Sequence, residues 1–114
     1  MSLDSLDTVD AISDSKGDGT VSLSIIDGWD WSDEAKHLFA LQAKINAYFD
    51  FVQSGQILET RPSARGKELK IQILTKYPLP EKATKFIAIA SKAAQQLNIE
   101  ITHNVLPSKA LPID

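Results

Sequence analysis

A long amphipathic segment over residues 32–54 constrains the fold of this chain more than any other feature. Its apolar residues recur every three or four positions, which is the spacing of a core-facing stripe on a helix. These residues are Leu38, Leu41, Ile45, Tyr48, Phe49 and Val52. Ser32 is predicted to be the N-cap, and Gly55 is well suited to end the helix. A helix with one such stripe needs an apolar surface to cover.

Segments that alternate apolar and polar residues can supply that surface as half-buried strands. They cover residues 20–26, 67–77 and 99–106. In the first of them Val21, Leu23 and Ile25 share a face, with serines between them. A weaker alternation over residues 7–13 adds a fourth strand.

Two hairpins are expected to connect these strands. The glycines of Lys16-Gly17-Asp18-Gly19 favour a tight turn between residues 7–13 and 20–26. Residues 56–60 are a short run containing apolar residues, and a turn-rich loop separates them from residues 67–77. We therefore expect a second hairpin there.

A second helix is predicted over residues 80–97, with Pro80 suited to its first turn. Its apolar stripe is rich in small residues, so the helix can lie close on a sheet. The stripe consists of Ala83, Phe86, Ile87, Ala90, Ala94 and Leu97. A helix between two strands of one sheet makes those strands parallel.

These elements predict an α+β fold, a two-layer sandwich with two helices on one face of a mixed sheet of four to five strands. The element order is ββα(β)βαβ, which also fits a ferredoxin-like variant. We expect one domain over residues 1–114, with its core at about residues 7–106 and a frayed tail at 107–114.

Composition narrows the class of protein. The 114 residues contain no cysteine, which excludes disulfides and thiolate chemistry and fits a reducing compartment. The N-terminus lacks the features of a signal peptide, and no apolar run has the length of a membrane span. We therefore expect a soluble, cytoplasmic protein without a membrane partner.

Charge is unevenly distributed along the chain. Residues 1–34 carry nine acidic residues and one basic residue, whereas residues 35–114 carry eleven basic and six acidic ones. This split is consistent with acidic and basic faces on one domain, which would steer partners or favour self-association. It is also consistent with ordinary solvated surfaces, and this is the interpretation that we favour.

The candidate site is the stretch IIDGWDWSDEAKHL at residues 25–38, where strand gives way to helix. The residues expected to form a binding surface are Asp27, Trp29, Asp30, Trp31, Asp33, His37 and Lys44. If the strand continues to Trp31, both tryptophans share the face of Ile25, and at least one is expected to close the core. The helix dipole alone explains Asp33 and Glu34.

His37 is the residue in this stretch with the clearest chemical potential. It could be a base oriented by Asp30, Asp33 or Glu34, or a polar flank of an exposed helix start. His103 shares the apolar face of its strand and is expected to be a satisfied sheet residue. Catalytic motifs and metal-ligand spacings are absent from the sequence, so we expect no enzymatic activity, no metal and no cofactor.

A basic loop follows the first helix. Arg61, Arg65, Lys67 and Lys70 surround Gly66 and could contact phosphates. Because no aromatic residue interleaves with them and the whole chain is acidic, nucleic-acid binding is disfavoured.

The chain resembles a bacterial family of small domains of unknown function. The residues that carry the resemblance follow a W-S-D…HL..LQ.K.N.Y…SG pattern from Trp31 to Gly55, and Lys76-Tyr77-Pro78-Leu79 adds to it. The resemblance implies a small α/β fold and brings no activity with it.

Taken together, the sequence predicts a non-enzymatic module that binds a protein partner or itself, as in a homodimer. Its surface would combine residues 27–44 with the free face or edge of the sheet. Ile26, Leu74 and Leu106 are out of step with the main stripes and are candidates for the second sheet face. Two alternatives are a small-ligand binder or minor enzyme using His37, and nucleic-acid contact through residues 61–70.

Overall fold

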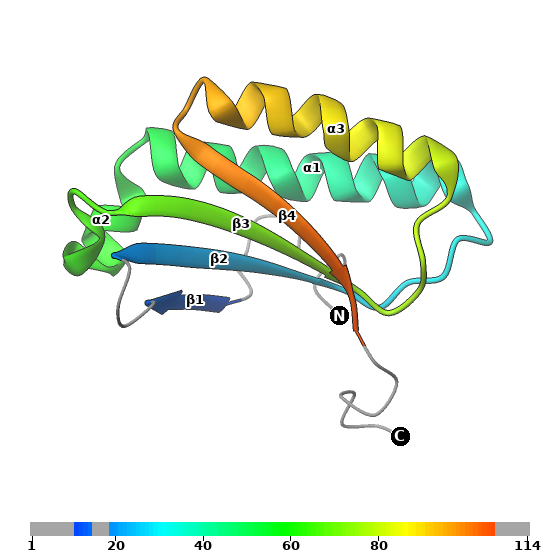
Figure 1. Ribbon diagram of the computed structural model, residues 1–114, viewed down its shortest axis with the longest axis horizontal. Helices are drawn as coiled ribbons and strands as arrows, with labels where there is room; N and C mark the ends of the chain where they lie inside the picture. The colour runs from blue at the N-terminus through cyan, green and yellow to red at the C-terminus, as the bar shows by residue number, and fades with distance from the viewer. Residues whose placement is uncertain (1–10, 15–18, 107–114) are drawn as a thin grey trace.

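The structure, a computed structural model, describes residues 11–14 and 19–106. In chain order its strands are β1 (Ala11–Asp14), β2 (Thr20–Asp27), β3 (Glu68–Thr75) and β4 (Ile99–Val105). Its helices are α1 (Glu34–Gln53), α2 (Gln56–Thr60), the short 3-10 helix η2 (Pro62–Ala64) and α3 (Glu81–Gln95). Both long helices lie on one face of the sheet, so the predicted two-layer α+β fold is confirmed (Figure 1).

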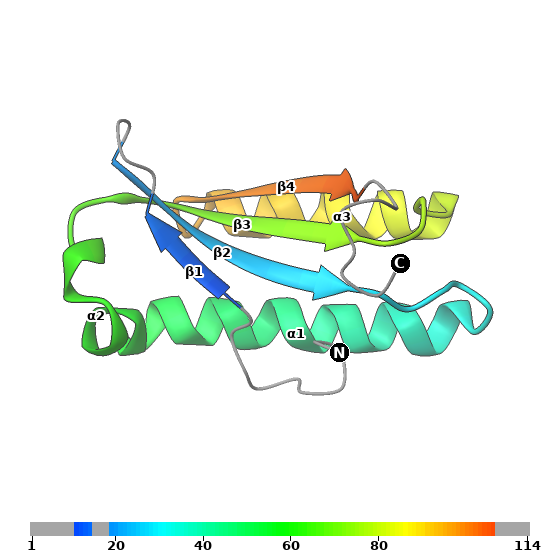
Figure 2. The same ribbon diagram turned by 90° about the horizontal axis from the view of Figure 1, so that it is seen from below.

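The sheet order is β1-β2-β3-β4. β1 pairs antiparallel with β2, as the first predicted hairpin requires, and β2, β3 and β4 are parallel to one another. Figure 2 shows β4 at the outer margin of the sheet with α3 behind it. The turn residues 15–18, the start of the predicted core at residues 7–10 and the predicted tail at 107–114 lie outside the described residues.

The core lies between the sheet and the two helices. β2 and β3 are in register, so that Val21, Leu23 and Ile25 lie opposite Leu69, Ile71 and Ile73. Leu41, Ile45 and Tyr48 of α1 are buried against this layer, and the Tyr48 hydroxyl donates a hydrogen bond of 2.6 Å to the Ser24 carbonyl. Three of the six residues of the predicted stripe are therefore on the buried face of α1, and the other three, Leu38, Phe49 and Val52, are half-buried.

Small side chains define how α3 packs. Ala83, Ala90 and Ala94 are its buried residues, and Ala94 is completely enclosed. Alanine at these positions lets the helix backbone approach the sheet, as the sequence predicted.

The second predicted hairpin is wrong. Gln56–Thr60 forms helix α2 instead of a strand, because Gly55, with φ of +84°, turns the chain directly into a new helical turn. Most residues of this segment are good helix formers, and only Ile57 is buried. Without that strand, β2 and β3 become parallel neighbours, which also excludes the ferredoxin-like variant.

The second face of the sheet is covered by neither α1 nor α3 (Figures 1 and 2). Ile26 alternates away from the buried residues of β2 and is 43% exposed, while Leu74 beside it is half-buried. These two residues lie on the face that the sequence assigned to them, whereas Leu106 follows the end of β4 and is half-buried. In the described part of the chain, no helix is long and apolar enough to cross a membrane.

Candidate functional site

The candidate site lies where β2 ends and α1 begins. Asp27 is the last residue of β2, so the strand does not extend to Trp31. This position is at the carboxyl ends of the parallel strands. Open α/β sheets most often bind ligands at that end of the sheet. What the site can do depends on which of its polar groups face solvent.

Asp27 and His37 form a buried pair. The His37 Nε2 atom lies 2.5 Å from the Asp27 Oδ2 atom, and both side chains are almost completely enclosed. Burial raises the pKa of Asp27, and the hydrogen bond and charge of His37 partly offset this rise. The backbone amide of Trp29 also donates to Asp27, at 3.0 Å.

The second nitrogen of His37 fixes where the protons lie. Nδ1 is 2.8 Å from the Asp30 carbonyl oxygen, which can only accept, so Nδ1 carries a proton and donates. The close contact between Nε2 and the Asp27 carboxyl therefore holds a single shared proton. His37 is oriented by Asp27 and by the backbone of Asp30, and not by Asp33 or Glu34.

Both tryptophans enclose this histidine. The Trp31 ring is stacked on the imidazole with centroids 3.6 Å apart, and Trp29 meets it edge-on at 5.6 Å. His37 is only 1% exposed. With both nitrogens engaged and the ring covered, His37 cannot exchange protons with a bound substrate without rearrangement.

Two aspartates of the junction accept hydrogen bonds from residues close to them in the chain. Asp33 is the N-cap of α1 and accepts from the Lys36 amide at 3.2 Å, so the predicted Ser32 cap is wrong by one residue. Ser32 instead donates its hydroxyl and its amide to Asp30, and these bonds lower the pKa of Asp30. An aspartate side chain readily accepts a hydrogen bond from the backbone amide two residues further along the chain, which explains why Asp30 is the acceptor.

Lys44 is completely buried, so its predicted place in the binding surface is wrong. It lies on the same helical face as Leu41, Ile45 and Tyr48, and its Nζ atom is 5.7 Å from the centroid of the Tyr48 ring. The spacing of Lys44 matched the apolar stripe, but its charge argued against burial. Lys44 therefore does not contribute to a surface.

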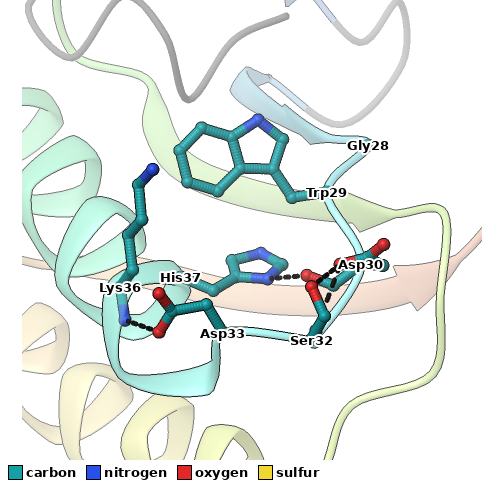
Figure 3. Close-up of a pocket in the computed structure, with 7 residues that line it drawn as sticks. All are labelled: Gly28, Trp29, Asp30, Ser32, Asp33, Lys36 and His37. Atoms are coloured by element: carbon teal, nitrogen blue, oxygen red, sulfur yellow. Dashed lines mark hydrogen bonds between the residues drawn. The ribbon is translucent and has the colours of Figure 1, made fainter.

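A hollow of about 370 Å³ opens beside the junction (Figure 3). It is lined by Gly28, Trp29, Asp30, Ser32, Asp33, Lys36 and His37. The Lys36 Nζ atom is 5.9 Å from the Trp29 ring centroid, so the protein's own cation lies over this aromatic face. Among the described residues, no group of three or more metal-ligating side chains could hold a metal ion.

His103 lies near the same end of the sheet. Its Nε2 atom is 2.9 Å from the Thr75 hydroxyl, as expected for a satisfied sheet residue. Partial burial lowers the pKa of His103, and the charge of Asp27 partly offsets this. The structure thus places Asp27, Thr75, His37 and His103 at the same end of the sheet. Sequence spacing could not predict this grouping.

A family model matches residues 1–107, and the family it describes is one of unknown function, DUF6572. The chain belongs to this family. The resemblance found in the sequence is therefore confirmed at the level of an uncharacterised family. No curated protein and no solved structure matches the chain.

The four cations of the predicted basic loop differ in their contacts and exposure. The Arg61 guanidinium donates to the Ile12 carbonyl of β1 at 3.4 Å. Lys70 lies on β3 with its Nζ atom 3.8 Å from the Glu100 carboxylate of β4. Arg65 is exposed and Lys67 is half-buried. Two of the four cations thus make contacts within the domain, and phosphate binding by the loop stays a prediction.

The free edge of β4 is a feature that the sequence did not locate, because strand order was unknown. β4 has β3 as its single strand neighbour among the described residues. Its register with β3 runs unbroken from Ile99 to Val105, so it contains no bulge. It also contains neither lysine nor proline, the residues with which proteins usually protect an edge.

Proposed function

We propose that this chain is a non-enzymatic protein-interaction module that accepts an extended segment of another chain along the edge of β4. The observation that carries this proposal is the seven-residue strand β4, which has no strand on its outer side among the described residues. Strand addition at such an edge gains main-chain hydrogen bonds, with side-chain contacts supplying specificity. The lack of cysteine supports a reducing setting such as the cytoplasm.

The direction of the β4 amides supports this use. The amide of Leu106 donates to the Thr75 carbonyl at 2.8 Å, so it faces β3. Because successive residues of a strand point their N–H and C=O groups to opposite sides, the amides of Glu100, Thr102 and Asn104 also face β3. The polar backbone groups of Ile101, His103 and Val105 then point outward, where another strand can pair with them.

The opposite edge of the sheet is a weaker candidate. β1 has four residues, so an added strand would gain few main-chain bonds there. The enclosed His37 supports a non-enzymatic role, since the one acid–base candidate of the junction is used to hold β2 to α1.

Site-specific photo-crosslinking in cells tests the proposal. A photoreactive residue at Asn104, which is exposed beside the edge, is expected to give adducts with an extended segment of a partner. The same residue at Glu59, exposed on α2, is the matched control. Adding Val105→Pro, which removes an outward amide and leaves the pairing with β3 in place, is expected to abolish the adducts.

Equal adducts at both positions, or adducts at Asn104 that survive Val105→Pro, would contradict binding at this edge. Thermal unfolding of each variant shows whether the domain remains folded.

A further inference from the structure

We infer that the segment accepted by β4 is β4 of a second copy, paired antiparallel about a two-fold axis that passes through Thr102. This inference rests on the proposed function and adds the identity of the partner. A contact of this kind is self-complementary, as a two-fold interface must be. It would join the two four-stranded sheets into one, with α1 and α3 of both copies on the same face.

Backbone geometry restricts the register of such a pair. Hydrogen-bonded pairs must join two residues whose amides point outward, and these are Ile99, Ile101, His103 and Val105. Thr102 is the middle residue of Ile99–Val105, so an axis through it overlaps the whole strand. Ile101 then pairs with His103 of the second copy, and Ile99 pairs with Val105. Shifting the axis to Ile101 or His103 shortens the overlap.

The side chains suit this register. On the second sheet face, Thr102 meets its own copy in a pair that is not hydrogen-bonded through the backbone, the closest kind of cross-strand pair. Glu100 meets Asn104 of the second copy, so no like charges lie opposite each other. The Lys70 Nζ atom lies 3.8 Å from the Glu100 carboxylate and comes from β3, so this ion pair is not on the outer side of β4.

Apolar surface on the helix face also favours the pair. Val105 is 43% exposed in the single chain, and Ile101 is half-buried. In the inferred register Val105 packs beside Ile99 of the second copy, which reduces its contact with water. No described helix extends past β4 to block this approach (Figure 2).

Sedimentation equilibrium of the purified chain tests the inference. The wild type is expected to show the mass of two chains, with dissociation on dilution. Thr102→Lys places two ammonium groups opposite each other at a Cα separation of about 4.5 Å, and is expected to give a monomer. Thr102→Val keeps the branched shape without the charge and is expected to remain a dimer.

Charge changes at Asn104 test the register itself. Asn104→Lys creates two attractive pairs with Glu100 across the axis and is expected to tighten the dimer roughly twofold to thirtyfold. Asn104→Asp creates two repulsive pairs and is expected to weaken the dimer by a similar factor. Glu100→Gln should abolish both effects. These exposed positions keep the test available even if Thr102→Lys fails to fold.

A wild type that is monomeric at every concentration would overturn the inference. A dimer that does not respond to Thr102→Lys or to the Asn104 charges would also overturn it, because that dimer uses another surface. If the chain is monomeric while photo-crosslinks at Asn104 lead to a different protein, this inference fails and the proposed function stands.

Discussion

At the scale of single residues, the junction between β2 and α1 is held by a histidine that is used structurally. Periodicity predicted that Leu41 and Ile45 would be buried, because apolar burial follows from spacing alone. The partners of His37 could not be predicted in this way. Asp27 lies ten residues before it, and the turn between them is set by the Asp30–Ser32 bonds and by the stacking of Trp31.

The Asp27–His37 pair is expected to show strong coupling in a double-mutant cycle. His37→Phe keeps an aromatic ring under Trp31 but leaves Asp27 buried without its main partner, which should cost about 3–5 kcal/mol. Asp27→Leu leaves the His37 Nε2 atom unpaired, at about 1–3 kcal/mol. In urea unfolding, the double variant should lose at least about 1 kcal/mol less stability than the sum of the losses in the two single variants. Additive losses would show that the two groups do not interact.

His103 is expected to make stability depend on pH below neutrality. Its folded-state pKa is lowered from 6.5, chiefly by burial, so the unfolded chain binds the proton first as pH falls. Stability from this group is complete above pH 6.5 and is lost as pH falls from there towards the folded-state pKa. His103→Gln should flatten this slope, which is at most about 1.4 kcal/mol per pH unit for one proton.

Urea unfolding of the wild type and of His103→Gln is compared from pH 7.5 down to pH 5, a range that spans the ordinary histidine pKa of 6.5. Asp27 acts in the opposite sense, since its pKa is raised in the folded state and stability therefore falls as pH rises above 3.8. Asp27 is present in both the wild type and His103→Gln, so it does not affect the difference between them. If the free energy of unfolding changes with pH to the same extent in the wild type and in His103→Gln, the pH dependence does not come from His103.

At the scale of helices and strands, alternation and helical spacing predicted the five longest elements because each has one buried face. Residues 20–26, 67–77 and 99–106 became β2, β3 and β4, and the two stripes became α1 and α3. The strand predicted at Gln56–Thr60 was wrong, because five residues with one buried side chain are too few to show a helical or a strand periodicity. The turn at Gly55 decided their conformation. Local rules are therefore informative only where an element is long enough to show a face.

The small-residue face of α3 gives a prediction at this scale. Ala94→Leu adds bulk where the side chain is completely enclosed, and should destabilise the domain by about 1–3 kcal/mol. Ala88→Leu makes the same change on the exposed side of the helix and should stay within about 0.5 kcal/mol of the wild type. Equal losses in chemical denaturation would mean that α3 does not pack on the sheet through its alanines.

At the scale of the whole molecule, the order of the strands decides which surface is open. Sequence patterns do not specify that β4 lies at an edge, since long-range pairing depends on how both helices cross the sheet. Once the order is known, the free edge and the direction of its amides follow from elementary strand geometry. The proposed binding surface is thus a property of the assembled fold, and its residues show no chemical motif.

Amide hydrogen exchange along β4, followed by NMR, tests the central claim that this edge pairs with another strand. Glu100, Thr102 and Asn104 face β3, and their amides should be protected at every protein concentration. The amides of Ile101 and His103 should be protected in concentrated wild-type protein and exposed on dilution or in Thr102→Lys. If they exchange as fast as unpaired amides at all concentrations while their neighbours stay protected, β4 does not pair with a second copy.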